Sequence, residues 1–577
     1  MALVDLITNP EAFVVPARAW IENNYWLLGT CAVGGLTACA GAGFAFRSLT
    51  GISKSKSHFG GKKQARKANL MRNTKLEFSG IPIGKIGRDR LCWIDQEPVL
   101  VTGGTRSGKG VGVIRPACLT YGGPMVMYDG GKGELFRDTA GYRSRFSHVL
   151  NFDLTNPDGV HFNFLDEVRP EFLVRDVENL VQAIPKPEDS DGHFEPAADE
   201  YISAVIIHIL LAEDESQKNM TGVLHFISRG DDGARKIVGA NAHPVAVSRA
   251  TSLFGATQED VNNDDGMKYR NSVYRSARVR LKVFDEDVVA KVTSRSDFRM
   301  KDLIWTSPKG KPVSLYLTSP ASDDDRLRPL VSMFLAFLIN TIMREQPALH
   351  GQPRTLLVID EFASLRMEIL QTAITKIVGL GCTMLLGAQS LSALRQKPYG
   401  TENQFRDNIR CYIAYAANDD KTAQEIAHAC GTVRESRTSY SKTRSPNSWM
   451  GTKGESTSEF EKPLITPGDV RAMPDDEELI FVTGQPVMKV NKIRDYEDPI
   501  LKQRLNLPLP PMRGPDGVYP NLPQPDPKSP WADVPKDEDN TVPDWLDETL
   551  PDMADIEPEQ KQPKKKRKLV AAVGNGE

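Results

Sequence analysis

The sequence has few of the residues that build disulfide frameworks or metal sites. It contains seven cysteines and nine histidines among 577 residues, with no C-x-x-C pair and no H-E-x-x-H segment. Zinc sites and disulfide frameworks require paired spacings of this kind. We therefore expect reduced cysteines, as in a cytosolic protein, and no structural metal. The cysteines are Cys31, Cys39, Cys92, Cys118, Cys382, Cys411 and Cys430.

An excess of charge of one sign is also lacking. The formal net charge is -3, with 25% charged and 40% apolar residues. This composition is typical of a globular protein and gives no global indication of nucleic-acid binding. The chain is longer than one ordinary domain, so we expect two or three domains and tails. His208 lies in an apolar run and is interpreted as a core or helix-face histidine.

Long apolar runs are scarce, and one stretch is clearly long enough to cross a membrane. Residues 26–46, WLLGTCAVGGLTACAGAGFAF, carry no charge and match a hydrocarbon core of roughly 30 Å. Nine Lys or Arg residues and no acid follow in 47–75, whereas Asp5, Glu11 and Glu22 precede the run. The positive-inside rule then places everything after Phe46 in the cytoplasm. A buried soluble helix is an alternative, and the acidic start argues against a cleaved signal.

A phosphate-binding loop is present without its last polar residue. Residues 100–116 read LVTGGTRSGKGVGVIRP, and Gly110 stands where a Ser or Thr would hold magnesium. An apolar strand precedes the loop and a helical segment follows it. Backbone N–H groups there would surround phosphates, and the lysine would reach the outer ones. The expected nucleotide contacts are Gly103, Gly104, Thr105, Arg106, Ser107, Gly108, Lys109 and Gly110.

Two acids and a glutamine follow later apolar strands. The segment RTLLVIDEFASL, 354–365, ends its strand in Asp360 and Glu361, at the edge where doubly wound sheets bind ligands. We expect Asp360 to hold magnesium, directly or through water, and Glu361 to polarise the attacking water. The strand CTMLLGAQS delivers Gln389 to the same edge. Gln389 either senses the terminal phosphate and positions water, or ends the strand as a polar residue.

The remaining pattern predicts a mostly parallel α/β sheet with a helical insertion. Apolar strands near 124–129 and 312–320 alternate with helical runs. Between about 167 and 300 strand signals are weak and helical runs dominate. The segment KYRNSVYRSARVRLK, 268–282, combines six basic residues with two tyrosines. It predicts either nucleic-acid contact or a solvated charged helix.

In their order, the motifs resemble the coupling proteins of type IV secretion and bacterial conjugation. The resemblance runs from about 60 to 498. It implies a RecA-like P-loop ATPase domain with an inserted all-α domain, and ATP and Mg²⁺ as cofactors. Carried over by motif, Lys109, Glu361 and Gln389 are catalytic and Asp360 binds the metal. The matching blocks are TRSGKGVGVIRP, KGELFRDTAGYRS, FNFLDEV, IDEFASL, GAQS, NDDKTAQEIAHACG and LITPGDVRAMPDDEELIFVTGQP.

The resemblance also implies an assembly and a location. Members form homo-hexamers anchored in the bacterial inner membrane and pass relaxase-bound DNA, effector proteins or both to a secretion channel. They usually have two spans, whereas one is clear here. Glycine after the P-loop lysine is compatible with the family, with water, Thr105 or Ser107 replacing the missing ligand and turnover slowed. The family block D-x-K-G-E stands here as DGGKGE, so no role is assigned to Asp129.

The ends of the chain and one internal loop have their own composition. Residues after 504 are rich in proline and acid, which predicts disorder. Trp531, Trp545, Leu546 and Leu550 are expected to fold on a partner such as a substrate adaptor. The basic run 563–569 is expected to contact nucleic acid or anionic lipid rather than to act as a nuclear import signal. The polar stretch 436–460 is expected to be a mobile loop.

The sequence predicts five regions and leaves some functions open. A catalytically weak receptor platform and a chromosome-segregation translocase are the alternatives to a coupling ATPase. An arginine acting on the neighbouring subunit would come from Arg326, Arg395, Arg406 or Arg410. The regions are 1–47 with a span at about 26–46, a basic linker 48–75, a nucleotide-binding domain 76–166 and 301–504, an all-α insertion 167–300, and a tail 505–577.

Overall fold

The computed structural model describes the central part of the chain and a few tail residues. Contacts divide it into two units, one containing 433–460 and the other containing 58–432 and the residues from 461 onward. The predicted span 26–46, Trp545, Leu546, Leu550 and the basic run 563–569 lie outside the described residues. The described residues are 58–71, 80–187, 192–254, 264–306, 310–365, 367–395, 399–400, 405–443, 452–511, 522–523 and 529–531.

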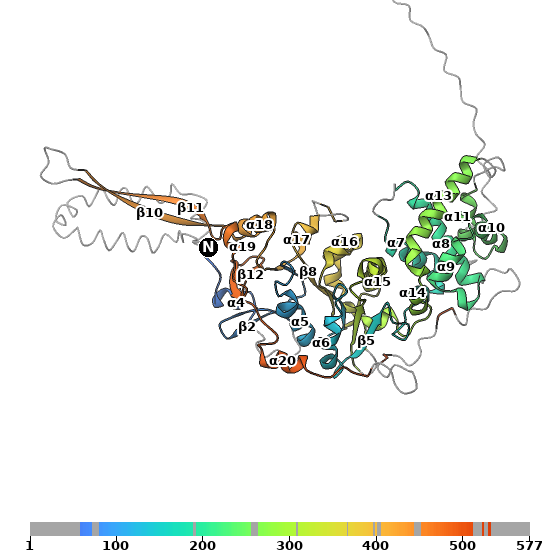
Figure 1. Ribbon diagram of the computed structural model, residues 1–577, viewed down its shortest axis with the longest axis horizontal. Helices are drawn as coiled ribbons and strands as arrows, with labels where there is room; N and C mark the ends of the chain where they lie inside the picture. The colour runs from blue at the N-terminus through green and yellow to red at the C-terminus, as the bar shows by residue number, and fades with distance from the viewer. Residues whose placement is uncertain are drawn as a thin grey trace, which may run out of the picture. The chain divides into compact units, whose positions relative to one another are not determined.

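The larger unit is built on an 11-stranded mixed sheet (Figure 1). The strand order is β2-β1-β13-β12-β9-β3-β8-β7-β4-β6-β5. The seven strands from β9 to β5 pair in parallel, and the four at the other end pair antiparallel. The strands are β1 Ile81–Ile86, β2 Asp89–Trp93, β3 Val99–Thr102, β4 Met125–Tyr128, β5 His148–Asp153, β6 Val313–Thr318, β7 Thr355–Ile359, β8 Cys382–Ala388, β9 Cys411–Ala414, β12 Glu477–Val482 and β13 Met488–Asn491.

Apolar side chains on both faces of the parallel strands explain their burial. Successive residues of a strand point to opposite faces, so Val99 and Val101 join one core cluster and Leu100 joins the other. The π-helix η2 Gly110–Ile114 and helices α5 Arg115–Thr120 and α6 Glu134–Arg143 cover the first face. Helices α15 Asp324–Glu345 and α16 Glu368–Leu380 cover the other (Figure 1).

Helix α15 belongs to the core of this unit. It is the one helix among the described residues that is long and apolar enough to cross a membrane, and 72% of its apolar window is buried. Its Leu330, Phe334, Phe337 and Leu338 lie in the large core cluster. Its length and composition are therefore accounted for by burial against the sheet.

Every described element between β5 and β6 is helical, in agreement with the composition of 167–300. These helices share the large core cluster with the sheet, and contacts place them in the same unit. His208 is buried in α8, as expected for a core histidine. The elements are η3 Phe164–Glu167, η4 Pro170–Phe172, α7 Leu173–Ala183, α8 Glu195–Ala212, η5 Glu215–Gln217, α9 Met220–Ile227, α10 Asp231–Ala240, α11 Pro244–Ser252, α13 Asp264–Leu281, η6 Lys282–Asp285, α14 Asp287–Val292 and η7 Met300–Leu303.

Shorter elements connect the strands. The five described cysteines are buried and free, and burial raises the pKa of Cys92 to about 11. The connecting elements are α4 Lys62–Lys67, η8 Pro347–His350, η9 Phe362–Ser364, η10 Ala393–Arg395, α17 Phe405–Asn408, α18 Asp420–Cys430, α19 Pro467–Arg471 and α20 Pro499–Leu505.

The stretch 436–460, which was expected to be a mobile loop, lies largely within two strands. Strands β10 Thr432–Thr443 and β11 Thr452–Pro463 form a two-stranded sheet. Both strands are mostly polar in sequence, so they lack the apolar alternation that marks a half-buried strand. Their many threonines have high strand propensity, and this was the one feature of the sequence that indicated strands here.

Part of the tail packs against the chain itself. Trp531 is 1% exposed, and its indole N–H donates to the carbonyl of Val168 at 2.9 Å. Leu522 packs against the same core cluster. A Cβ built on Gly141 would lie 2.3 Å from the carbonyl oxygen of Leu507, so the start of the tail lies directly on α6. The expectation that Trp531 is an anchor awaiting a partner is therefore wrong, because its socket is in this chain.

Candidate nucleotide-binding site

The loop between β3 and η2 has the backbone of a phosphate cradle. Gly108 has φ +91° and Arg106 has φ +62°. Positive φ is unusual for an arginine, and such strain is concentrated at functional sites. A π-helix, Gly110–Ile114, follows the loop directly and continues as α5 through Pro116. π-helical turns are also frequent at functional sites.

Two glycines near the loop are required by the neighbouring Tyr415. A Cβ on Gly103 would lie 2.9 Å from Tyr415 Cβ, and a Cβ on Gly112 would lie 2.4 Å from Tyr415 Oη. Gly110 is different, because a Cβ there would meet no atom within 4 Å. The absence of a Ser or Thr at Gly110 is therefore not imposed by packing.

The P-loop lysine is buried and held by its own loop. Lys109 is 9% exposed, and its Nζ donates to the carbonyl of Gly103 at 2.5 Å. Burial lowers the pKa of Lys109, while Asp360 and Glu361 act in the opposite direction. These two acids are thus close enough to influence Lys109 although they lie some 250 residues later in the chain.

Asp360 and Glu361 follow β7 at the same sheet edge. In the sheet Thr102 pairs with Ala388 and Ile359 pairs with Leu386, so β3, β7 and β8 end side by side. Asp360 is 6% exposed, and its Oδ1 is a buried oxygen without a hydrogen-bond partner among the described residues. Burial raises the pKa of Glu361, and Asp360 contributes in the same direction.

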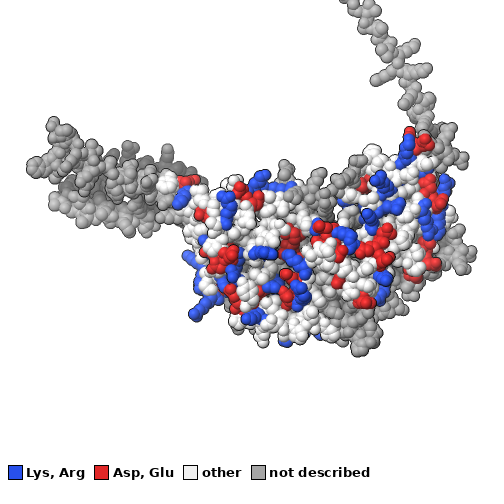
Figure 2. Space-filling model, viewed as in Figure 1, with Lys and Arg blue, Asp and Glu red and all other residues white. Residues whose placement is uncertain are grey.

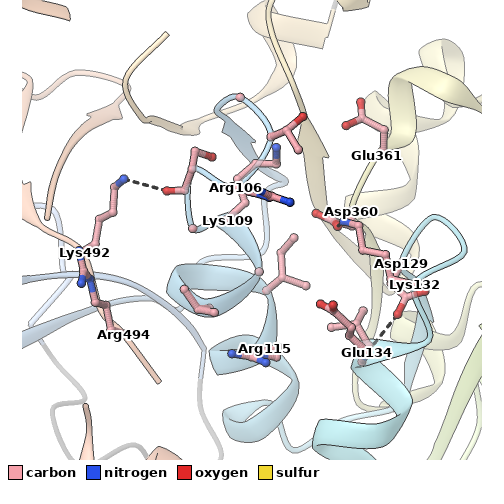
Figure 3. A pocket seen from close by; sticks show the side chains of 18 of the residues that line it. Arg106, Lys109, Arg115, Asp129, Lys132, Glu134, Asp360, Glu361, Lys492 and Arg494 are labelled. Carbon is pink, nitrogen blue, oxygen red and sulfur yellow. Dashed lines mark hydrogen bonds and ion pairs between the residues drawn. The ribbon is translucent and has the colours of Figure 1, made fainter. Parts of the chain in front are cut away.

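One cavity contains all the residues predicted for catalysis and metal binding (Figure 3). Its volume is about 560 Å³, and the P-loop from Gly104 to Gly110 lines it together with Asp360, Glu361 and Gln389. Gln389 is exposed and comes directly after β8. Gly103 is buried and begins the loop. The predicted convergence of Lys109 with the acid pair is therefore present in the fold.

Asp129 and Lys132 also line this cavity, although the motifs gave neither a role. Asp129 accepts hydrogen bonds from the backbone N–H groups of Gly133 and Leu135, both at 3.0 Å. Gly130, Gly131 and Gly133 all have positive φ, so the glycines of DGGKGE form a tight turn. The turn places Lys132 Nζ in an ion pair with Asp360 Oδ2. The KGE block was the sequence signal for this element.

A second wall of the cavity follows β13. Lys492, Arg494, Tyr496 and Asp475 line it, together with Arg115 from α5. In Figure 3, Lys492 and Arg494 lie across the P-loop from Asp360 and Glu361. The sequence carried no motif for this wall, because its residues meet the loop only through the antiparallel part of the sheet.

The arginine candidates for action in trans are paired within this chain. Arg326 forms ion pairs with Glu286 and Asp323. Arg395 pairs with Glu425, and Arg410 pairs with Glu97. The side chain of Arg406 lies outside the described residues. None of the three described arginines lines the cavity.

The residues present fit a nucleotide with a magnesium ion. The loop offers positive-φ glycine backbone beside a lysine, which suits phosphate. The unpartnered Asp360 Oδ1 is a hard oxygen ligand of the kind Mg²⁺ prefers. Ser107 Oγ is also buried without a partner among the described residues, and Ser107 lines the same cavity.

Comparisons with known proteins place the chain in a family. The family described as Type IV secretory system Conjugative DNA transfer matches residues 54–511. The Conjugal transfer protein TraG of Escherichia coli is 29% identical over 456 residues, covering 72% of this chain and 69% of that protein. Protein VirD4 of Agrobacterium fabrum is 27% identical over 436 residues, covering 71% and 60%.

Solved structures show the same fold. The plasmid coupling protein TrwB in complex with ADP and Mg²⁺ has a TM-score of 0.54 and 19% identity, covering 76% of this chain and 94% of that one. The sulphate complex of the same coupling protein gives a TM-score of 0.55 with 20% identity, covering 76% and 93%. The predicted family resemblance is confirmed, and this chain belongs to the type IV secretory system conjugative DNA transfer family.

Proposed function

We propose that this chain hydrolyses ATP at the cavity between its P-loop and Asp360–Glu361 to drive a conjugative substrate into a type IV secretion channel. The observation that carries the proposal is the position of Lys109, Asp360, Glu361 and Gln389 on one cavity. Parallel strands end at this edge, where α/β sheets bind ligands.

Each side chain has a proposed task. The P-loop backbone and Lys109 bind the phosphates, and Lys109 exchanges its contact with the Gly103 carbonyl for a phosphate oxygen. Asp360 holds Mg²⁺, directly or through water, which in the bound state would neutralise developing phosphate charge. Glu361 accepts the proton of the attacking water, since burial keeps its pKa higher than usual and makes it a better base. Gln389 orients that water from the end of β8.

Gly110 cannot supply the hydroxyl ligand that a Ser or Thr would give to Mg²⁺. We propose that Ser107, rather than Thr105, supplies it. The Oγ of Ser107 is buried without a partner among the described residues, whereas Thr105 is exposed. Ser107 or a water would then complete the shell around Mg²⁺. Neither ligand has the position that the hydroxyl of a Ser or Thr at position 110 would have. We therefore expect slow ATP turnover rather than none.

Substrate transport also requires assembly, a membrane anchor and partners. We propose a homo-hexamer anchored in the inner membrane through 26–46, with the bulk of the protein in the cytoplasm, and contacts with channel components and relaxase-bound DNA, effector proteins or both. The all-α insertion and the tail are the parts proposed to recognise the transported substrate. An adaptor protein is the proposed partner of the tail. Oligomerisation would bring an arginine of the next subunit to the cavity.

Helix α13 is the proposed nucleic-acid contact. Three of the six cations predicted in 268–282 have partners in the chain, since exposed Lys268 pairs with Asp265, buried Arg270 with Asp231 and buried Arg280 with Asp199. The other cations, Arg275 and Arg278 on α13 and Lys282 at the start of η6, are exposed, and Tyr269 on α13 is 42% exposed. Figure 2 shows acidic and basic side chains mixed over the visible face of the helical part, so a local contact is favoured over a broad basic surface.

The competing function is a receptor platform that binds nucleotide without turning it over. Gly110 is the observation that favours it. Steady-state ATP turnover of the full chain separates the two, with Lys109→Ala and Glu361→Gln as reference variants. The proposed ATPase loses activity at least about a hundredfold in each variant. Turnover no higher than in these variants, even with DNA, would favour the platform.

A further inference from the structure

Lys492 is a buried lysine on the wall of the cavity that lies across the P-loop from Asp360 and Glu361 (Figure 3). It is 5% exposed and follows β13 directly. Its Nζ donates to the carbonyl oxygen of Ser107 at 3.0 Å (Figure 3). A buried ammonium needs such partners, because transferring it out of water unpaired is costly.

The position of Lys492 is fixed by the sheet beneath it. Its Nζ lies 3.8 Å from the centre of the Tyr415 ring, which is a cation–π distance. Tyr415 is fully buried, and its backbone N–H donates to the carbonyl of Thr102 at 2.9 Å. Burial lowers the pKa of Lys492, and the buried Glu478 opposes this most strongly. Lys492 is therefore held by the buried Tyr415, which is hydrogen-bonded to the last residue of β3.

Holding the Ser107 carbonyl orients the next amide. In a trans peptide the C=O of Ser107 and the N–H of Gly108 point in opposite directions. A carbonyl held by Lys492 therefore turns the Gly108 N–H away from Lys492. Gly108 is at φ +91°, where glycine has several accessible conformations and an external contact is needed to select one.

We propose that Lys492 is a positioning residue of the nucleotide site, which sets the Ser107–Gly108 peptide so that its N–H faces the phosphates. This rests on the proposed nucleotide site. The Gly108 N–H binds substrate and product phosphates alike, so the contribution of Lys492 is to nucleotide affinity and not to the chemical step. The neighbouring residues on the same wall, Arg494 and Tyr496, have no contact of this kind with the loop among the described residues.

The test is Lys492→Met in the full chain, since methionine keeps the length of the side chain and loses its charge. Lys489→Met is the matched control, because Lys489 lies on β13 itself and pairs with Glu477. We expect the Kd for Mg·ADP and the KM for ATP to rise about tenfold in Lys492→Met, with kcat within about threefold of the unchanged protein. Lys489→Met should leave all three constants as they are.

Hydrogen exchange provides a readout that a merely structural lysine would not give. Without nucleotide, amides in 103–110 should exchange faster in Lys492→Met, while the rest of the chain and its melting temperature stay unchanged. Unaltered nucleotide affinity would overturn the proposal, as would a joint loss of kcat and thermal stability. Failure of the proposed function looks different, because the unchanged chain would then show no Mg·ADP binding that depends on Lys109.

Discussion

Lys132 Nζ forms an ion pair with Asp360 Oδ2, joining the glycine-rich turn after β4 to the end of β7. The Asp360 side chain is 9% exposed and that of Lys132 is 53% exposed, so the lysine reaches in from the surface. In the absence of nucleotide, this pair neutralises the carboxylate proposed to hold magnesium. Lys132 and Mg²⁺ therefore compete for the negative charge of the same carboxylate.

Removing Lys132 should make magnesium easier to bind. In Lys132→Met we expect the Mg²⁺ concentration for half-maximal ATPase activity to fall about two- to fivefold, because a partly exposed ion pair contributes about 1 kcal/mol or less. A magnesium titration of ATP turnover measures this. Lys236→Met, which removes an exposed ion pair in the helical insertion, is the control. A higher magnesium requirement would show that Lys132 supports the metal site instead.

Restoring a hydroxyl after the P-loop lysine should be tolerated. A Cβ on Gly110 meets nothing within 4 Å, so Gly110→Ser should keep the melting temperature and lower the magnesium requirement severalfold. The matched variant Gly112→Ser lies in the same π-helix, and its Cβ would overlap Tyr415 Oη. We expect it to lose about 1–3 kcal/mol of unfolding free energy. Equal stability of the two variants would contradict this account of Gly110.

Much of this site could be predicted because its strands are short and apolar on both faces. The runs before Gly103, Asp360 and Gln389 are strands buried in a parallel sheet, and parallel order places their carboxyl ends at one edge. Local sequence was sufficient for the loop and the acid pair. The helical character of 167–300 was also evident, since its apolar residues recur at helical spacing.

The rest depended on contacts between distant segments. Lys492 meets the P-loop only because four antiparallel strands bring β13 to the parallel half, and no local pattern encodes that pairing. Asp129 seemed displaced in its block, yet glycines at positive φ let its carboxylate cap α6. The sequences of β10 and β11 are mostly polar without apolar alternation, so periodicity could not reveal these strands. The sequence around Trp531 predicts an exposed anchor, because the buried site beside Val168 is formed by residues far away in the chain.

The pH dependence of kcat/KM should be a narrow bell. Burial raises the pKa of Glu361, so its carboxylate, and with it the activity, is lost as pH falls through that raised value. Burial lowers the pKa of Lys109, so its ammonium is lost as pH rises through a value below that of an ordinary lysine. Because kcat/KM reports ionisations of the free enzyme, this is the constant to measure. A profile in which activity falls at neither the acidic nor the basic side would contradict both roles.

The tail should stabilise the body of the protein through Trp531. Trp531→Ala should cost about 3–5 kcal/mol of unfolding free energy, because it empties a fully buried site. Thermal unfolding of the full chain measures the loss. A chain that ends after Trp531 should melt at the temperature of the full chain, whereas one that ends after Pro510 should melt lower. Equal melting temperatures for all of these proteins would show that the socket contributes no stability.

The central claim is that the P-loop and the acid pair bind one triphosphate between them. The most direct measurement is an experimental structure of the full chain with Mg²⁺ and a non-hydrolysable ATP analogue. The account predicts that Lys109 Nζ leaves the Gly103 carbonyl for a phosphate oxygen, and that Mg²⁺ lies about 2.1 Å from Asp360 or from a water held by it. A triphosphate bound on another surface, or a metal ion remote from Asp360, would contradict the account.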